Sequence, residues 1–558
     1  MNTQHYEYQL TLDKIIRKAA QIYPNTEVVH APPGGPIIRS NYAKEWDRIQ
    51  RLGSVLEELG AIPGEPGKFG SKIAVLDWNT IMHFELYYGV PMYGAVLHTV
   101  NVLLSPEDII YTMMHAQDDI LFINEDFTSL ARVATSLIKT IKKVVIMSNK
   151  PDHEEVTFDG AEVYWYEDLI RDARPYNFQE LSENMVATMM FTSGTTGGRP
   201  KGTYFTHRQL VLHAMSVALS LSAPPINANI YDVAMPPLVP PMFHVHAWGL
   251  PYIAALTGIK QVYPGRFDWG WVLKTIKEEG VTITNGVPTI LYNLLYHPDS
   301  PKYDLSGLKF IIGGSALPRG GLLEEANRRG GIRVVQGFGL TETAPVILLT
   351  MEKSNMKDWP EERKREIILS AGLPIPLVDV RVVDENGRDV PRDGKTMGEL
   401  VVRAPWITRE YLGDPEKTRN AWRDDWFHTD DIAVWDSEGY VWIMDRAKDV
   451  IKSGGEWISS TRLEDLISTH PAVYEVAVIG APHPKWGERP VAIVVPKPGQ
   501  DITEGEIRKY LMELVNEGKM PKWWVPDKVI IVNSELPKTS TGKIDKKALK
   551  DRLSITLD

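Results

Sequence analysis

The stretch TSGTTGGRPKGT, residues 192–203, brings hydroxyl side chains, glycines and cations close together. Glycines let backbone N–H groups approach an anion, and hydroxyl and ammonium groups add further donors. The spacing is not that of a Walker loop, because Lys201 stands between Pro200 and Gly202 and not in a Gly-Lys-Ser/Thr sequence. The stretch therefore predicts a different cradle for a triphosphate tail, with these candidate donors: Thr192, Ser193, Gly194, Thr195, Thr196, Gly197 and Lys201.

The flanking residues predict how this loop is held. MVATMMF before it is typical of a buried strand, and THRQLVLHAMSVALSL after it has helical spacing. Thr206 and Gln209 form a capping-box pattern at the start of that helix. We expect the loop to lie between strand and helix, where backbone N–H groups can hold phosphate. A flexible linker is not expected at such a place.

Four further stretches carry residue types that suit a nucleotide site. They are QGFGLTETAP (336–345), IIGGSALP (311–318), the run 426–459 and LPKTSTGKIDKKAL (536–549). Their candidate residues are Gly313, Gly314, Ser315, Gly337, Phe338, Gly339, Thr341, Glu342, Asp431, Arg446, Lys448, Gly454, Gly455 and Lys543.

The pattern of elements predicts the fold class. Apolar strand-like runs alternate with helical segments through the first two thirds of the chain, which indicates layered α/β structure with parallel sheets. From residue 379 the pattern changes to hairpin-like strands with Asn-Gly turns. We therefore predict a large α/β N-terminal domain over 1–445, with layered α/β subdomains and a β-rich subdomain. A small mobile α+β C-terminal domain over 446–558 is predicted to follow, with the boundary near 445–449.

Length and composition exclude several classes of protein. A chain of 558 residues exceeds one ordinary core, and the net charge of −11 without a long basic block argues against a nucleic-acid surface. The absence of cysteine removes disulfides and a cysteine nucleophile, so any thiol must come from outside. The start has no signal-peptide pattern and no apolar run is long enough for a bilayer, so we expect a cytoplasmic protein without an integral membrane segment.

The five motifs, in this order, resemble those of the adenylate-forming superfamily of acyl-CoA synthetases, adenylation domains and luciferases. The resemblance covers nearly the whole chain. Residues 240–265 and 448–459 are most similar to the medium- and long-chain fatty acyl-CoA synthetase branch. It implies an AMP-forming ligase that uses ATP, Mg²⁺ and coenzyme A to activate a carboxylic acid. Medium-chain fatty acids are the first expectation, and short-chain or hydroxylated acids follow.

The resemblance also implies roles for single residues. Residues 192–201 would hold the β- and γ-phosphates, Thr341 the α-phosphate, and Glu342 with Thr192 the Mg²⁺ ion. Phe338 would stack on adenine beside the 313–315 backbone. The usual Thr-Gly-Asp is Thr429-Asp430-Asp431 here, and we assign the ribose contact to Asp431, with Arg446 nearby.

The C-terminal motifs imply two successive uses of one domain. Lys543 resembles the lysine that bridges the attacking carboxylate and the α-phosphate. Lys448 aligns with the hinge about which the domain rotates, and Gly454 and Gly455 would then line the channel for the pantetheine thiol.

The acyl end is expected around His244, Trp248 and Gly339, with pocket walls from 246–251, 287–289 and 313–339. His244 would lie beside the reacting carboxyl group, and Trp248 aligns with an aromatic that gates a fatty-acid tunnel. A metal site at His244 and His246 is an alternative without a third ligand motif, and Trp248 as a plain core residue is another.

Other functions fit the chain less well. GFGLTE has a glutamate at the third glycine of the dinucleotide fingerprint, and GGSALP is no nucleophile elbow. A carrier-loading adenylation enzyme or a nucleotide sensor remains an alternative. The resemblance further implies a homodimer through N-terminal segments.

Overall fold

Two large sheets form the N-terminal part of the molecule. A computed structural model describes residues 6–150, 155–192, 199–236, 241–313, 322–329, 331–454, 456–538 and 544–553. The first sheet has the order β7-β6-β5-β3-β4-β8-β9 and is parallel up to β8, while β9 pairs antiparallel with β8. Its strands are β3 (Lys72–Leu76), β4 (Val96–Thr99), β5 (Ile120–Asn124), β6 (Lys143–Met147), β7 (Glu162–Trp165), β8 (Val186–Phe191) and β9 (Gly202–Thr206).

The second sheet has the order β16-β15-β14-β13-β12-β10-β11-β1-β2, with a parallel centre and antiparallel edges. Its strands are β1 (Glu27–His30), β2 (Ile38–Asn41), β10 (Val233–Ala234), β11 (Lys260–Tyr263), β12 (Ile283–Gly286), β13 (Lys309–Gly313), β14 (Arg333–Gly339), β15 (Val346–Leu349) and β16 (Leu373–Pro374). The central strands are apolar runs because helices cover both faces.

One layer of helices lies between the two sheets and shares a single hydrophobic core with both. It contains α1 (Asp13–Ile22), α2 (Tyr42–Glu58), α3 (Ile81–Tyr93), α7 (His207–Ser222) and α8 (Leu250–Thr257). All of α3 is buried, which agrees with its apolar character on every side. The outer faces are covered by α4 (Pro106–Ala116) and α5 (Thr128–Leu137) on the first sheet and by α9 (Trp269–Glu279), α10 (Pro288–Tyr296) and α11 (Leu322–Arg328) on the second, while α6 (Tyr166–Asp172) packs on α2.

The β-rich region after residue 378 is an antiparallel sheet, as its turns predict. Gly387 of the Asn-Gly turn has φ +74°, which a glycine adopts without strain. The strands are β17 (Asp379–Val383), β18 (Gly398–Arg403), β19 (Trp422–Arg423), β20 (Trp426–Trp435) and β21 (Val441–Arg446), with α12 (Glu361–Ile368) and α13 (Pro415–Ala421) beside them.

The C-terminal part has its own sheet and core. It contains β22 (Ile451–Ser453), β23 (Glu456–Ile458), β24 (Val473–His483), β25 (Gly487–Pro496), β26 (Lys528–Ile531), α14 (Ser460–Ser468), α15 (Glu504–Asn516) and α16 (Lys546–Leu553). The preceding sheet ends at Arg446 and the new one begins at Ile451. The division between 445 and 446 stays a prediction.

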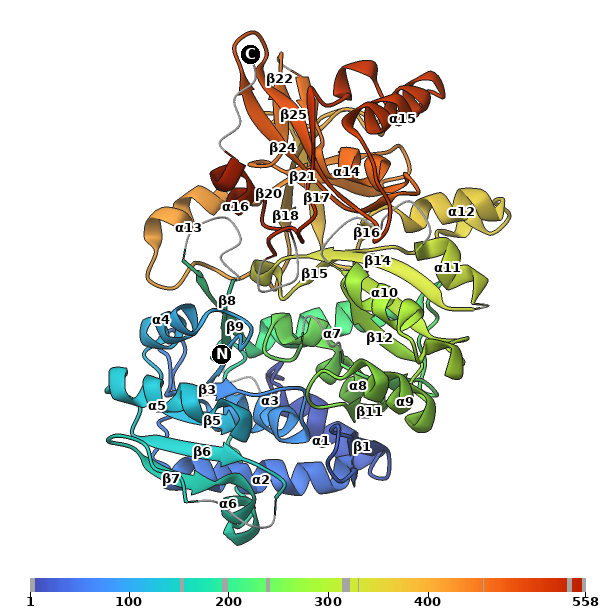
Figure 1. The fold of residues 1–558 in the computed structure, drawn as a ribbon. Coiled ribbons are helices and arrows are strands. Elements are labelled where there is room, and N and C mark those ends of the chain that lie inside the picture. Colours follow the sequence, from blue (N-terminus) through green and yellow to red (C-terminus); the bar gives the residue numbers. More distant parts are fainter. Residues whose placement is uncertain are drawn as a thin grey trace.

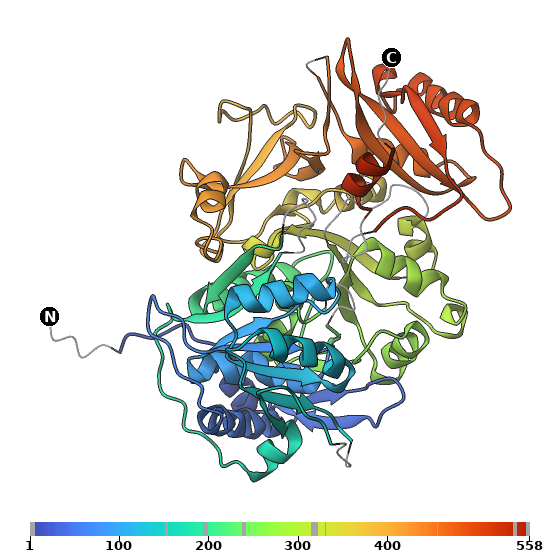
Figure 2. The ribbon, with the colours of Figure 1, turned by 60° about the vertical axis from the view of Figure 1, so that its left-hand side comes forward.

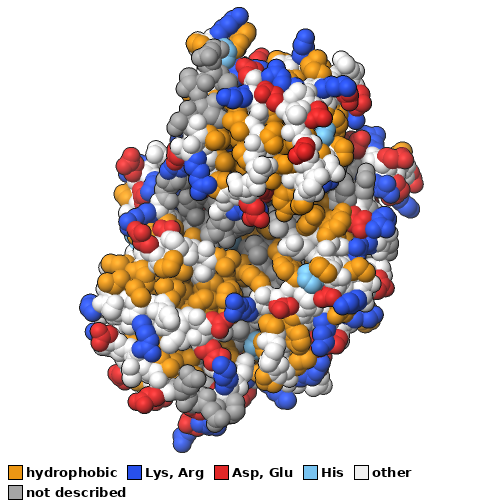
Figure 3. Space-filling view, viewed as in Figure 1, with side chains coloured by type: hydrophobic (Ala, Val, Ile, Leu, Met, Phe, Trp, Pro, Cys, Tyr) orange, Lys and Arg blue, Asp and Glu red, His pale blue; other side chains and the backbone are white. Residues whose placement is uncertain are grey.

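Figures 1 and 2 show the β-rich sheet and the C-terminal part side by side above the two α/β layers. A large α/β N-terminal region and a small C-terminal domain are therefore confirmed. On the face shown in Figure 3, basic and acidic side chains are interspersed over all of these parts. Among the described residues, no helix is both long and apolar enough to cross a bilayer.

One predicted connection is wrong. Residues 192–201 do not join a strand directly to a helix, because Gly202–Thr206 forms β9 and returns along β8. Helix α7 begins only at His207, with the expected capping box of Thr206 and Gln209. Thr203, Tyr204 and Phe205 favour extended structure, which explains the extra strand. The loop therefore connects two antiparallel strands, and β9 separates it from α7 along the chain.

Candidate active site

The base of the loop 193–200 is fixed by two hydrogen bonds between its flanking residues. The Thr192 N–H donates to the Lys201 carbonyl at 2.9 Å, and the Lys201 N–H donates to Thr192 Oγ1 at 3.0 Å. The Thr192 hydroxyl accepts here, so its own proton can be donated to a bound anion. The predicted donors Ser193, Gly194, Thr195, Thr196 and Gly197 lie outside the described residues.

Lys201 and Glu342 are brought together by a residue that the sequence analysis missed, Tyr411. The Tyr411 hydroxyl accepts from Lys201 Nζ at 2.9 Å and donates to Glu342 Oε1 at 2.7 Å. Lys201 Nζ lies 3.9 Å from the same carboxylate oxygen and 4.1 Å from the centre of the Tyr411 ring. Burial and the neighbouring carboxylate of Glu342 raise the pKa of Tyr411, so the phenol stays protonated and keeps donating.

Residues 407–412 tie this group to both large sheets. The Thr408 N–H donates to the Glu342 carbonyl, and the Leu412 N–H donates to the Gly202 carbonyl. The Thr408 hydroxyl also donates to the Tyr204 carbonyl on β9. The segment therefore fixes Tyr411 between Lys201 and the 341–343 motif. No sequence pattern indicates this contact, because the partners are far apart along the chain.

The Glu342 carboxylate also fits a magnesium ion by its chemistry. Mg²⁺ is commonly held by one or two carboxylates, with nucleotide phosphates and water supplying the other oxygens. Among the described residues there is no cluster of three or more potential ligands, so the nucleotide would have to complete the coordination. Glu342 is almost buried beside Lys201, which suits a site that opens only toward phosphate.

Phe338, Gly339 and Thr341 follow one another at the carboxyl end of β14. Phe338 and Thr341 are buried, at 7% and 8% exposure. A Cβ at Gly339 would lie 1.9 Å from the carbonyl oxygen of Pro345, so only glycine lets the two backbones come this close. Gly314 and Ser315, the other predicted adenine neighbours, lie outside the described residues.

Trp248 lies against a pair of glycines on neighbouring strands. Gly313 and Gly337 are register partners on β13 and β14. A Cβ at Gly313 would lie 1.9 Å from Cζ2 of Trp248, and one at Gly337 would lie 2.8 Å from Cζ3. The two glycines, which we expected to serve the nucleotide, therefore make room for the indole ring.

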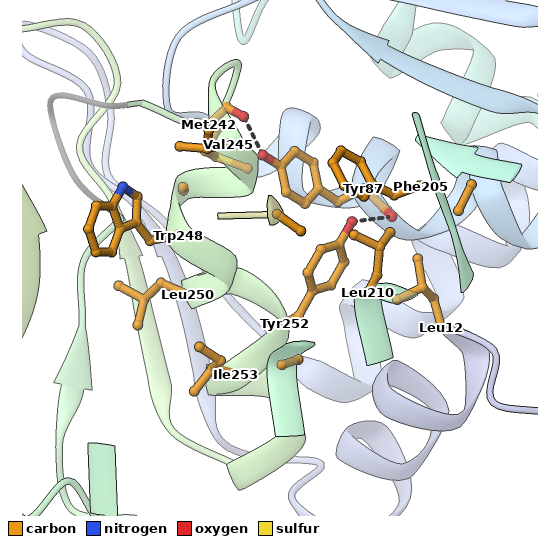
Figure 4. Packing of buried hydrophobic residues seen from close by; sticks show 14 of the residues in the cluster. Leu12, Tyr87, Phe205, Leu210, Met242, Val245, Trp248, Leu250, Tyr252 and Ile253 are labelled. Atoms are coloured by element: carbon orange, nitrogen blue, oxygen red, sulfur yellow. Dashed lines mark hydrogen bonds between the residues drawn. The ribbon is translucent and has the colours of Figure 1, made fainter. Parts of the chain in front are cut away.

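The backbone before Trp248 is strained. Val245, His246, Ala247 and Trp248 all have φ between +45° and +61°, a region that costs L-residues about 1–2 kcal/mol each. Such strain persists only where the surroundings fix the backbone. Here the turn directs Trp248 onto the sheet and His246 to the opposite side (Figure 4 shows Trp248 on one side of α8 and Tyr252 on the other).

The two histidines of His-x-His do not share a ligand position. His246 is buried, and its Nε2 is 2.8 Å from the Thr188 hydroxyl on β8. Burial lowers the pKa of His246 to about 3, so the imidazole is neutral. His244 is only partly buried at the start of the turn. Within the described part of the chain no metal-binding cluster includes either histidine, so the metal alternative is not supported.

Asp431 and Arg446 pair across β20 and β21. Arg446 Nε lies 3.0 Å from Asp431 Oδ1, and Asp431 is 3% exposed. Asp430 is exposed and has φ +57°, the conformation in which glycine is favoured. Asp430 therefore has the backbone conformation expected for the glycine of the Thr-Gly-Asp pattern that the resemblance implies, and the ribose contact of Asp431 stays a prediction.

The predicted thiol-channel residues lie apart from Lys201, Tyr411 and Glu342. Gly454 forms a turn within the C-terminal domain, where its N–H donates to the Trp486 carbonyl at 2.8 Å. Figure 1 shows β22 at the outer end of that domain, far from β9. Lys448 is exposed in the connection between β21 of the β-rich sheet and β22 of the C-terminal sheet. Gly455 and Lys543 lie outside the described residues. Next to Lys543, Ile544 forms a bridge with Lys538, and Lys546 of α16 donates to Ser460 of α14.

Comparison of the sequence with known proteins finds relatives that match nearly the whole chain. The family model described as "AMP-binding enzyme" matches residues 16–412, and the model of its C-terminal domain matches 462–543. A long-chain-fatty-acid–CoA ligase of Thermus thermophilus is 41% identical over 98% of this chain and 96% of its own length. A 3-methylmercaptopropionyl-CoA ligase of Ruegeria lacuscaerulensis is 36% identical, with 98% of each chain covered. A medium-chain-fatty-acid–CoA ligase of Ectopseudomonas oleovorans is 35% identical, with 98% of this chain and 96% of its own covered.

Solved structures agree with the fold. An anthranilate CoA ligase in complex with anthranoyl-AMP superposes with a TM-score of 0.82 over 99% of both chains, at 23% identity. A fatty acyl CoA synthetase of Mycobacterium tuberculosis gives a TM-score of 0.68 over 98% of both chains, at 28% identity.

The contact between Trp248 and Gly313 predicts an energetic coupling. Gly313→Ala should lower the free energy of unfolding by about 1–3 kcal/mol, because the new methyl group overlaps the indole ring. In a Trp248→Ala background the same change should cost less than about 1 kcal/mol. Denaturant titrations of the wild type, the two single variants and the double variant measure these free energies of unfolding. Gly505→Ala is the control, since a Cβ at that helical glycine would have no neighbouring atom within 4 Å. Equal losses in both backgrounds would contradict the packing role.

Proposed function

Because the chain belongs to the AMP-binding enzyme family, we propose that it is an AMP-forming acyl-CoA ligase, an acid–thiol ligase that acts in two steps. A carboxylate oxygen first attacks the α-phosphorus of ATP, and the bond to pyrophosphate breaks, which gives an acyl-adenylate. The thiol of coenzyme A then attacks the acyl carbon, and AMP leaves with the electrons of its bond. The observation that carries the proposal is the Lys201–Tyr411–Glu342 group beside the phosphate loop.

The first step must bring two anions together, so fixed positive charge is the main requirement. Lys201 is held by the Tyr411 hydroxyl at the base of the loop, where its charge would stabilise the leaving pyrophosphate. Thr192 has a hydroxyl proton directed by its bond to Lys201. A magnesium ion bound at Glu342 would neutralise phosphate charge. We assign the α-phosphate to Thr341, which follows β14 on the same motif.

The adenosine end would be recognised by shape and by one carboxylate. Phe338 offers an aromatic face for adenine, and stacking does not need the hydroxyl that many relatives carry at this position. Asp431 can accept hydrogen bonds from the ribose hydroxyls, while Arg446, 3.0 Å from Asp431 Oδ1, orients the carboxylate. Phe338 and Asp431 are supplied by different sheets, so the nucleotide would lie between them.

The carboxyl group of the acid is assigned to the neighbourhood of His244 and Gly339. The acyl chain would continue past Trp248 and along α8, where a cavity of about 150 Å³ is lined mainly by apolar side chains, together with Ser222, Asn229 and Thr257. A medium-chain fatty acid is our first candidate, with short-chain and hydroxylated acids next. The relatives support a range of acids, because their names include long-chain, medium-chain and methylthio-substituted substrates.

The second step requires the C-terminal domain to present another face. In the present arrangement β22 and the Gly454 turn that follows it lie away from β9 and Lys201. The turn would therefore reach the acyl-adenylate only after rotation of the domain about Lys448. Rotation of one domain separates the two half-reactions in space and prevents premature loss of the adenylate. A homodimer and a cytoplasmic location stay predictions.

Tyr411 is predicted to be a residue that positions Lys201 and Glu342 for the phosphates of ATP. Tyr411→Phe keeps the ring beneath Lys201 but removes the hydroxyl that joins it to Glu342. We expect kcat/KM for ATP to fall about tenfold or more, while the KM for the acid changes little. Acid-dependent pyrophosphate release at varied ATP and Mg²⁺ measures this. Tyr204→Phe, which removes a hydroxyl bonded to exposed Glu410, is the control. Identical behaviour of the two variants would sink the assignment.

Lys543 is predicted to act in the first half-reaction alone. Lys543→Ala should lower acid-dependent pyrophosphate release by about 10²-fold or more, because the charge opposing the two anions is lost. Thioester formation from supplied acyl-adenylate and coenzyme A should be nearly unchanged. Lys538→Ala, in the same motif but paired with Glu475, is the matched control. Equal loss of both steps would rule out this division of labour, and nucleotide binding without any acid-dependent release would favour a sensor.

A further inference from the structure

Asn285 is a buried amide without a partner. It lies on β12 at 3% exposure, and neither its Oδ1 nor its Nδ2 has a hydrogen-bond partner in the described part of the chain. Buried polar side chains are nearly always paired, because an unmade hydrogen bond in the interior is costly. The position therefore calls for a ligand group or another explanation.

The strand register shows which way Asn285 faces. Side chains alternate along a strand, so Asn285 shares a face with Ile283 and not with Thr284. Its register partner is Ile311 on β13. Ile283 and Ile311 both belong to the core that contains Trp248 and α8, whereas Phe310, the partner of Thr284, belongs to the core on the other side. Asn285 is therefore directed toward α7 and α8.

Along this face Asn285 lies between Trp248 and the apolar cavity. Trp248 covers Gly313, which is two residues beyond Ile311, the register partner of Asn285. The cavity is lined by Ile283, which is two residues before Asn285, or about 7 Å along the strand. Leu250, Ile253 and Ala254 of α8 form the facing wall. Figure 4 shows Trp248 just before α8, with Leu250 and Ile253 following along the helix.

The neighbouring polar side chains on these strands are satisfied. Lys309, the register partner of Ile283, is 2.6 Å from Asp232 Oδ2, and its ammonium also donates to the Asn227 carbonyl. Thr284 donates to the Met235 carbonyl on the opposite face. The Lys309 ammonium is thus already paired with a carboxylate, which does not favour a second carboxylate beside it.

Building on the proposed function, we propose that Asn285 is a specificity residue that binds a hydroxyl group on the acyl chain of the acid. A carboxamide offers both a donor and an acceptor, and a hydroxyl group can use either. An unsubstituted chain in the same place would exclude water from the amide without replacing its hydrogen bonds. A site of this kind discriminates against the analogue that lacks the polar group.

The test compares pairs of acids of equal chain length, one unsubstituted and one hydroxylated, with the hydroxyl moved outward from carbon 3. For at least one position we expect wild-type kcat/KM to favour the hydroxylated acid by about tenfold or more. Asn285→Leu should lower that ratio at least about tenfold by raising activity toward the unsubstituted acid. Asn285→Ala gives the same comparison if the leucine variant does not fold. Thr284→Val, on the opposite face of the same strand, should leave the ratio unchanged.

The outcomes separate the two proposals. A wild-type enzyme that prefers the unsubstituted member of every pair overturns the specificity role, and so does a ratio that Asn285→Leu and Asn285→Ala leave unchanged. If no acid of either series triggers pyrophosphate release by the wild-type protein, the proposed function is overturned, and the role of Asn285 with it. A shift confined to the Asn285 variants, with the KM for ATP unaltered, supports the inference.

Discussion

Negative charge concentrated at one point is the constraint on which this architecture depends, because a triphosphate and a carboxylate have to meet inside a folded protein. The chain meets it by joining residues that lie far apart in sequence. Lys201 comes from the hairpin of one large sheet, Glu342 follows a strand of the other, and Tyr411 connects them from a segment that belongs to neither. A cation held in this way does not have to be ordered when the nucleotide binds. Its charge can therefore stabilise the charged transition state without a cost of reorganisation.

The large-scale fold was predictable because long periodic segments leave little ambiguity. The apolar strands, the capping box of α7 and the change to hairpins after residue 378 all follow from local chemistry. The strand β9 was missed because five residues of mixed polarity beside a glycine-rich loop are compatible with either a turn or an edge strand. Tyr411 was missed for a different reason. Its role depends on partners about 70 and 210 positions away, and no local pattern reports a contact of that range.

Gly313 and Gly337 have a packing role that their motifs do not indicate. Gly313 and Gly337 fall in motifs that suggest backbone contacts to a nucleotide, yet in the structure each lies directly under the indole ring of Trp248. The same ring is held there by a turn with four successive residues in left-handed conformation. The glycines predicted for the nucleotide and the tryptophan predicted for the acyl wall are therefore in direct contact on β13 and β14. Asp430, at the glycine position of the Thr-Gly-Asp pattern that the resemblance implies, has φ +57°, a conformation that glycine adopts without strain.

The division of this site into polar and apolar ends has a consequence for selectivity. Apolar walls distinguish acids of different length only weakly, because each methylene contributes about 0.8 kcal/mol. A buried amide distinguishes more sharply, because an acid that does not pair with it leaves a polar group without water or partner. Asn285 stands on the face of the sheet that packs against the core containing Trp248 and α8. Evolution of such an enzyme toward plain fatty acids would be expected to remove this side chain first, since no other described residue needs its hydrogen bonds.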